Sequence, residues 1–184
     1  MTKCIDFYFD FISPYSYLAF KKIKSLQKKD QINFNYKPIF LGGLHNLGGV
    51  IAPAFNERKM KNMKNDCELI AKKNNIDFKW NNNFPINSLY LMRGYIFIEN
   101  EKKEKFFEVC FDSYWKENLD ISQNINLNKI LDKCNINQEN FHNGIKDQKI
   151  KNELKELTDK AFKLDVFGAP TFLINDKLFW GQDR

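Results

Sequence analysis

Residues 5–20, IDFYFDFISPYSYLAF, read as a buried strand that runs directly into a helix. Apolar side chains alternate over residues 4–11, as they do in a strand with one buried face. Ser13 is a residue type preferred at a helix N-cap. Pro14 suits the first helical position, where its missing N–H costs nothing. The stretch therefore predicts a strand over residues 4–11 and a helix from Pro14 to about Lys29.

A second strand is expected soon after this helix. Ile32, Phe34 and Tyr36 alternate in INFNYKP, residues 32–38. Strand, helix and strand then form a β-α-β unit, whose two strands are predicted to be parallel. One face of the intervening helix is apolar, which suits packing on this sheet.

The rest of the chain changes character twice. LGGLHNLGGVIAP, residues 41–53, is expected to be a Gly-rich loop, and it lacks the spacings of phosphate-binding loops. Helical periodicity then dominates for about a hundred residues. The tail returns to strand character, with residues 171–174 and 178–180 flanking an expected hairpin turn at 175–177.

This order predicts an α/β protein with a thioredoxin-like fold. A large all-helical insertion, residues 41–160, separates the β-α-β unit from the β-β hairpin. The thioredoxin-like domain is expected to comprise residues 1–40 and 161–184.

Composition argues against nucleic acid as a partner. The formal net charge is +6, but 26 of the 29 basic residues are Lys and only Arg58, Arg93 and Arg184 are Arg. The lysines are scattered, and Arg is the residue type that reads bases and phosphates best. The three arginines are by the same reasoning candidates for function or packing.

No apolar run reaches the length of a membrane span, and no signal or transit peptide is recognisable. We therefore expect a cytoplasmic protein without membrane contact. The four cysteines, Cys4, Cys67, Cys110 and Cys134, lie far apart and form no metal-ligand pattern with the two histidines. They are predicted to be buried, reduced thiols, and no metal is expected.

Single features of the candidate site are weak signals. Ser-Pro at a helix start, Gly168-Ala169-Pro170 before a strand, and Gly-Gln-Asp-Arg after one each have an ordinary structural interpretation. Their order along the chain is informative: a hydroxyl-capped helix, a helical insertion, a Pro before the next strand, and then an acidic residue.

In this order the sequence resembles the 2-hydroxychromene-2-carboxylate isomerases and the kappa-class glutathione transferases, relatives of DsbA-type thioredoxins. DFISPYSYLAF is similar to the family's Ser-Pro-Tyr-Ser turn. FLGGLHNLGG followed by RKMKNMKND, FPINSLYLMR, and the final third from KIKNELKEL to GQDR are similar to its other segments. The resemblance spans nearly the whole chain.

The resemblance implies glutathione as cofactor, with its sulfur at Ser13 in place of a thioredoxin cysteine. A hydroxyl cannot attack a disulfide, but it can donate a hydrogen bond to an external thiolate, which a helix N-terminus also stabilises. Pro14 and Tyr15 would shape the turn. The resemblance further implies a cis Pro170, with the backbone of Ala169 pairing with the cysteinyl unit of glutathione.

Gln182 and Asp183 match the pair that holds the γ-glutamyl end in the family. Lys59 matches a basic family position, and a solvated helix lysine is the alternative reading. Val50 stands where the family commonly has Asn, so that polar contact is missing and another thiol stays open as the ligand. Relatives continue past the position of Arg184 into a final helix that covers the sheet, and we expect that this helix is missing here.

The resulting prediction is a glutathione-dependent isomerase of the 2-hydroxychromene-2-carboxylate type. The glutathione thiolate, held at Ser13, would add reversibly to a conjugated aromatic keto-acid bound near Tyr15 and Arg93. A kappa-class-like glutathione transferase is the alternative enzyme. A non-catalytic thioredoxin-like module that binds thiols or peptides is the alternative of another class. A homodimer is expected.

Overall fold

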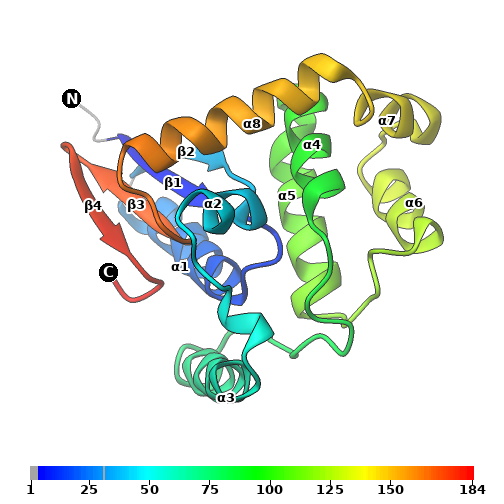
Figure 1. Ribbon diagram of the computed structural model, residues 1–184. Coiled ribbons are helices and arrows are strands. Elements are labelled where there is room, and N and C mark those ends of the chain that lie inside the picture. The colour runs from blue at the N-terminus through cyan, green and yellow to red at the C-terminus, as the bar shows by residue number, and fades with distance from the viewer. Residues whose placement is uncertain (1–3, 31) are drawn as a thin grey trace.

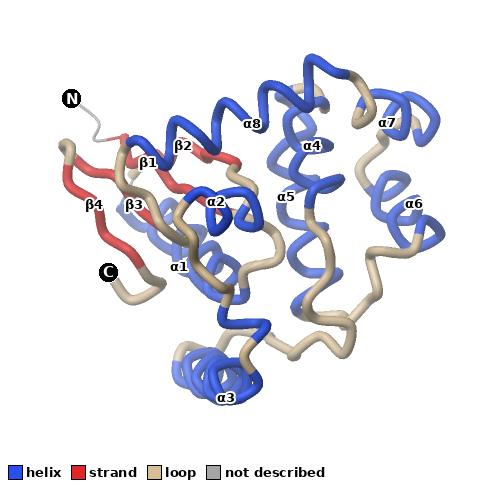
Figure 2. Tube along the Cα trace, in the orientation of Figure 1, coloured by secondary structure: helices blue, strands red, loops and turns tan. Residues whose placement is uncertain are grey.

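Strands from the first and last parts of the chain form one four-stranded sheet with helices on both faces (Figures 1 and 2). The computed structural model describes residues 4–30 and 32–184. The elements in chain order are β1 (Cys4–Phe9), α1 (Pro14–Asp30), β2 (Asn33–Pro38), α2 (Leu41–Leu47), the 3-10 turn η1 (Pro53–Phe55), α3 (Glu57–Lys73), α4 (Leu89–Phe97), α5 (Asn100–Trp115), α6 (Asn124–Lys133), α7 (Gln138–Gly144), α8 (Gln148–Lys163), β3 (Thr171–Ile174) and β4 (Lys177–Trp180).

The strand order is β2-β1-β3-β4. β1 and β2 are parallel, with Phe7 opposite Tyr36, so the predicted β-α-β unit is confirmed. β3 runs antiparallel to β1, with Phe172 opposite Phe7, and pairs with β4 as a hairpin. Chain ends that are far apart in sequence therefore meet in the middle of one sheet, and the predicted thioredoxin-like fold is confirmed.

The alternation in β1 assigns its side chains to opposite faces of the sheet. Phe7 and Phe9 are fully buried in the larger cluster, which includes residues of α1 and α5. Tyr8 points to the other face, into a smaller cluster with Leu44 of α2 and Ala161 of α8. Figure 1 shows α8 crossing the sheet and reaching α4, so this helix joins the sheet to the helical part.

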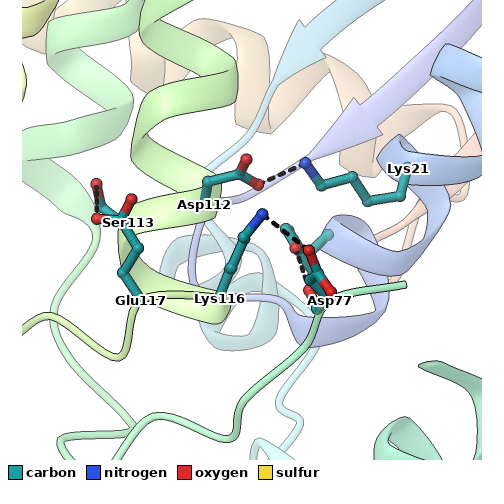
Figure 3. A network of polar contacts seen from close by, with 7 residues as sticks. Lys21, Asp77, Asp112, Ser113, Lys116 and Glu117 are labelled. Carbon is teal, nitrogen blue, oxygen red and sulfur yellow. Dashed lines mark hydrogen bonds and ion pairs between the residues drawn. The ribbon is translucent and has the colours of Figure 1, made fainter. Parts of the chain in front are cut away.

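Two kinds of contact tie the helical part to α1 and its preceding turn. The indole Nε1 of Trp115, at the end of α5, donates to the carbonyl of Phe11 at 3.0 Å. A polar network lies nearby, in which Lys21 of α1 pairs with Asp112 of α5 at 2.5 Å and Lys116 pairs with Asp77 at 2.8 Å (Figure 3). The Trp115 and Lys21 contacts therefore tie α1 and the turn before it to α5, whereas the Lys116–Asp77 pair lies within the insertion.

The expectation of a loop over residues 41–53 is wrong for its first half, because residues 41–47 form α2. Glycine is a poor helix former, but tertiary packing overrides this weak preference. A Cβ on Gly42 would lie 2.8 Å from Cζ of Phe40, so the missing side chain gives room to that ring. Leu44 is buried, and the amide of Leu41 bonds to the carboxylate of Asp10.

Three smaller expectations also need correction. Cys4 is exposed, because it lies at the outer end of β1 beside the exposed Asn33, whereas the other three cysteines are buried as predicted. β1 ends at Phe9, although Phe11 is buried in the following turn. The hairpin turn has two residues, Asn175 and Asp176, and Lys177 already belongs to β4.

No helix among the described residues is long and apolar enough to cross a membrane.

Candidate functional site

The hydroxyl of Ser13 lies where the N-terminus of α1 meets the segment before β3. Its Oγ accepts a hydrogen bond from the amide of Ser16 at 3.1 Å, the N-cap contact that the sequence predicts. The same hydroxyl donates to the carbonyl of Ala169 at 2.8 Å. Residues 156 positions apart are thus joined at one side chain, which is 4% exposed.

The helix that Ser13 caps favours a negative charge at this position. α1 is 17 residues long and has no acidic residue in its first turn. Its N-terminal N–H groups carry a partial positive charge, which a carboxylate in the first turn would have reduced. A thiolate or another small anion next to Ser13 would therefore be stabilised by both the hydroxyl and the helix.

The segment opposite Ser13 has a cis peptide bond between Ala169 and Pro170, as the family resemblance implied. The hydroxyl of Thr171 donates to the carbonyl of Gly168 at 2.7 Å. The carbonyl of Pro170 accepts from the amide of Gly181 at 3.0 Å. The backbone around Ala169 is therefore fixed on both sides.

Tyr15 has its hydroxyl committed to another element. It donates to Asp66 Oδ2 of α3 at 2.8 Å. Burial, together with the contact to Asp66, raises the pKa of the Tyr15 phenol, which stays protonated at neutral pH. Burial likewise raises the pKa of the neighbouring Cys67 thiol. The Tyr15–Asp66 bond thus ties α1 to α3, and Cys67 is a protonated packing residue.

Gln182 and Asp183 follow β4 and line a cavity of about 300 Å³ along α1. The side-chain oxygen and the carbonyl of Gln182 both accept from Nζ of Lys22. The side chain of Asp183 is 57% exposed, and its Oδ1 lies 3.8 Å from Nε of Arg184. Gly181 has φ +110, a conformation that favours glycine, and it turns the chain toward α1. Among the described residues, no hydrogen bond or ion pair joins Gln182 or Asp183 to Ser13, and Ser13 does not line their cavity, so a shared site stays a prediction.

Lys22 is a residue that sequence reasoning missed. It lies on α1 as one of many lysines, and nothing in its local sequence distinguishes it. Burial lowers its pKa, and the charge of Asp183 opposes that shift. Only the return of the chain end to α1 gives Lys22 a partner.

Asp10 is a second residue that was missed. It is fully buried, and its carboxylate accepts from the amides of Ile12 at 3.1 Å and Leu41 at 2.9 Å. Burial raises its pKa to about 6, against hydrogen bonds from Leu41, Ser88 and Ile12 that lower it. The sequence offered no signal of this burial, because strand alternation places Asp10, like Asp6, on the face opposite Phe9 and Phe11, where a polar residue is ordinary.

The three remaining candidate residues are Lys59, Val50 and Arg93. Lys59 is exposed on α3, where its amide bonds to the N-cap residue Asn56. Val50 is 52% exposed. Arg93 lines a different cavity, between α2, α4 and α8, whose lining includes neither Ser13 nor Tyr15. Neither cavity brings Arg93 together with Ser13 or Tyr15. The predicted place of Arg93 beside the aromatic acceptor is therefore not supported.

Among the described residues, no group of three or more His, Cys, Asp or Glu is arranged to hold a metal ion.

Comparisons with known proteins agree with this architecture. Residues 4–184 match the model of the DSBA-like thioredoxin domain family. The 2-hydroxychromene-2-carboxylate isomerase of Sphingobium xenophagum is 29% identical over 191 residues, which cover 100% of this chain and 95% of that protein. Glutathione S-transferase kappa 1 of Homo sapiens is 25% identical over 199 residues, covering 100% of this chain and 88% of the other.

A solved structure of a 2-hydroxychromene-2-carboxylate isomerase superposes with a TM-score of 0.89 at 25% identity, covering 98% of this chain and 90% of that one. The chain belongs to the family of DSBA-like thioredoxin domains. Within that family it is similar to proteins named as isomerases and as glutathione transferases, and both are enzyme classes. The predicted resemblance and the expectation of an enzyme are thereby confirmed.

Proposed function

We propose that this protein is a glutathione-dependent isomerase of the 2-hydroxychromene-2-carboxylate type. The observation that carries the proposal is the Ser13 hydroxyl, placed at the N-terminus of α1 and hydrogen-bonded to Ala169 beside the cis Pro170. The similarity to three enzymes of that name in sequence and one in structure supports it. When bound, glutathione would supply a nucleophilic thiolate for reversible addition to a conjugated aromatic keto-acid.

The residues at the turn fit the thiol end of glutathione. Ser13 offers a hydroxyl, and α1 offers a positive end without a competing carboxylate. A hydroxyl has one proton, and that proton is now donated to the Ala169 carbonyl. To bind a thiolate, Ser13 has to turn its proton away from Ala169, whose carbonyl then needs another donor. A cysteinyl amide paired with Ala169 would be that donor.

Gln182 and Asp183 fit the γ-glutamyl end of glutathione less directly. Asp183 is a partly exposed carboxylate that could accept from the γ-glutamyl ammonium. Gln182 is already bonded to Lys22, so Lys22 would hold the segment that carries Asp183. Because Val50 stands where the family commonly has Asn, a thiol other than glutathione is an alternative ligand.

Two alternatives stay within the same site. A kappa-class-like transferase would use the same thiolate without elimination, and the similarity to kappa transferases favours it as second candidate. A non-catalytic binding module would bind the thiol without activating it. Thiol redox activity is disfavoured, because neither Ser13 nor Ser16 can form a disulfide. A homodimer, a cytoplasmic location and a small aromatic substrate belong to the same proposal, and light scattering in solution tests the dimer.

The Ser13→Ala substitution tests the proposal. It removes a hydrogen bond to a charged acceptor, typically worth about 1.5–3 kcal/mol, and should raise the pKa of bound glutathione by about one to two units. The thiolate absorbance on adding glutathione measures this pKa, and calorimetry with S-methylglutathione measures binding, which should change little.

An unchanged thiolate absorbance in the variant would contradict the role of Ser13, and no glutathione binding by the wild-type protein would contradict the cofactor. Ser25→Ala, on the exposed part of α1, is the matched control. Product analysis then separates an isomerase, which returns free glutathione, from a transferase, which leaves it in a conjugate.

A further inference from the structure

The cavity between α2, α4 and α8 is separate from the Ser13 turn. Its volume is about 560 Å³, within the usual range of small-molecule pockets, and its lining includes none of Ser13, Ala169 and Pro170. Figure 1 shows α8 running from the sheet to α4, with α2 in front of the sheet. Residues of all three helices line the cavity.

Arg93 of α4 is an unusual cation in this cavity. Its Nε is inaccessible to solvent and has no hydrogen-bond partner among the described residues. Its pKa is lowered by burial alone, with no carboxylate acting in the other direction. Arg93 is only partly buried, so the rest of its guanidinium can be reached from the cavity, and a planar guanidinium whose Nε lacks a protein partner is suited to an incoming anion.

The other charged groups around the cavity leave an excess of positive charge. Lys155 and Asp159 of α8 pair with each other at 2.6 Å, so their charges largely cancel. Lys151, one turn earlier on the same helix, also lines the cavity, and no ion pair is found for it among the described residues. Arg93 and Lys151 therefore leave two positive charges uncompensated.

The remaining walls suit an apolar body. Phe40, Leu47 and Leu89 line the cavity beside Arg93. Phe40 is fixed, because its amide donates to the hydroxyl of Thr158 at 3.1 Å and that hydroxyl donates to the carbonyl of Leu154 at 2.8 Å. A bare inorganic anion would leave these apolar walls and most of the volume unused.

We propose that this cavity binds a small organic acid, an aromatic or similarly apolar carboxylate whose anionic group pairs with Arg93. A carboxylate matches the planar guanidinium, and the arene would lie against Phe40 and the two leucines. Lys151 at the same cavity adds attraction at longer range. This site is independent of the thiol chemistry proposed for Ser13.

Calorimetry with 2-naphthoate, 2-naphthamide and inorganic phosphate tests the proposal on the full chain. The wild-type protein should bind 2-naphthoate at least about tenfold more tightly than the neutral amide or phosphate. Arg93→Gln should remove that preference, whereas Lys160→Gln, at an exposed position of α8 outside the cavity, should keep it. Ser13→Ala should bind 2-naphthoate as the wild-type protein does.

A melting measurement without ligand separates binding from structure. Because the Arg93 charge is unpaired, Arg93→Gln should melt at the same temperature as the wild-type protein or higher, and 2-naphthoate should no longer stabilise it. Equal binding of acid and amide by the wild-type protein would overturn the proposal, and this comparison needs no variant. Loss of 2-naphthoate binding in Ser13→Ala would also overturn it, by placing the acid at the turn.

Discussion

Ser16 is a fully buried hydroxyl whose Oγ has no hydrogen-bond partner among the described residues. It takes the place of the second cysteine of a redox turn, yet its amide rather than its side chain contacts Ser13. Burying an unpartnered hydroxyl typically costs about 1–3 kcal/mol. We infer that its side chain adds no stability to the turn.

Ser16→Ala should therefore leave the free energy of unfolding unchanged or raise it by about 1 kcal/mol, since alanine is also the better helix former. Urea denaturation measures the change. Ser13→Ala, which removes an N-cap, should lower the free energy of unfolding by about 0.5–2 kcal/mol. A clear loss of stability in Ser16→Ala would mean that its hydroxyl has a partner.

Asp10 predicts a pH dependence of stability. Its pKa is raised from 3.8 to about 6 in the folded protein, so the folded state binds this proton more tightly than the unfolded chain does. The corresponding stability is present below pH 3.8 and is lost as the pH rises through about 6, with a total of about 3 kcal/mol from a shift of about two units.

Urea denaturation between pH 3.5 and 7 should show this decline in the wild-type protein and a smaller one in Asp10→Asn. Glu156→Gln, at an exposed position of α8, should keep the wild-type profile. The same profile in wild-type protein and Asp10→Asn would refute the raised pKa. The comparison of slopes stays valid even though the asparagine amide fits the Leu41 contact less well.

At the scale of single elements, the β3–β4 hairpin is closed by two residues in the left-handed region, Asn175 with φ 48 and Asp176 with φ 61. Two-residue hairpin turns with positive φ at both positions favour Asn followed by Gly. Asp176 tolerates this conformation less well than glycine.

Asp176→Gly should raise the free energy of unfolding by about 0.5–1 kcal/mol, because the strain at that residue is relieved. The melting temperature checks this result. Lys177→Gly, one residue later in β4, should have the opposite sign, since glycine weakens a strand. Destabilisation by Asp176→Gly would mean that the aspartate side chain stabilises the turn.

At the scale of the whole molecule, α3 packs against α1 and contributes Met63, Cys67 and Ala71 to the main core. Figure 1 shows it apart from the group α4–α7, and Figure 2 shows the short helical turn η1 just before it and an irregular segment after it. The bond from Tyr15 to Asp66 attaches it to α1. The division into a thioredoxin-like domain and an insertion domain, residues 41–160, stays a proposal. α8 packs on both β2 and α4, so it contacts both parts.

Tyr15→Phe should loosen α3, because it removes a bond to a carboxylate worth about 1.5–3 kcal/mol. Hydrogen exchange should become faster over residues 57–73 and little changed in the sheet. Tyr90→Phe is the matched control, since it removes a 2.6 Å bond to Ile121 far from α3 in the sequence. Unchanged exchange in α3 for Tyr15→Phe would show that other contacts hold this helix.

The sequence alone determined the strands and long helices, because their apolar residues repeat with the period of each element. It also determined the turn at Ser13, where an N-cap residue and a proline act through local geometry. The tertiary structure decided what depends on distant partners. The Ser13 bond to Ala169, the burial of Asp10, the pairing of Lys22 with Gln182 and the helix in the Gly-rich segment all arise from groups far apart along the chain. Periodicity and capping report only on neighbours, so packing between distant segments had to be seen.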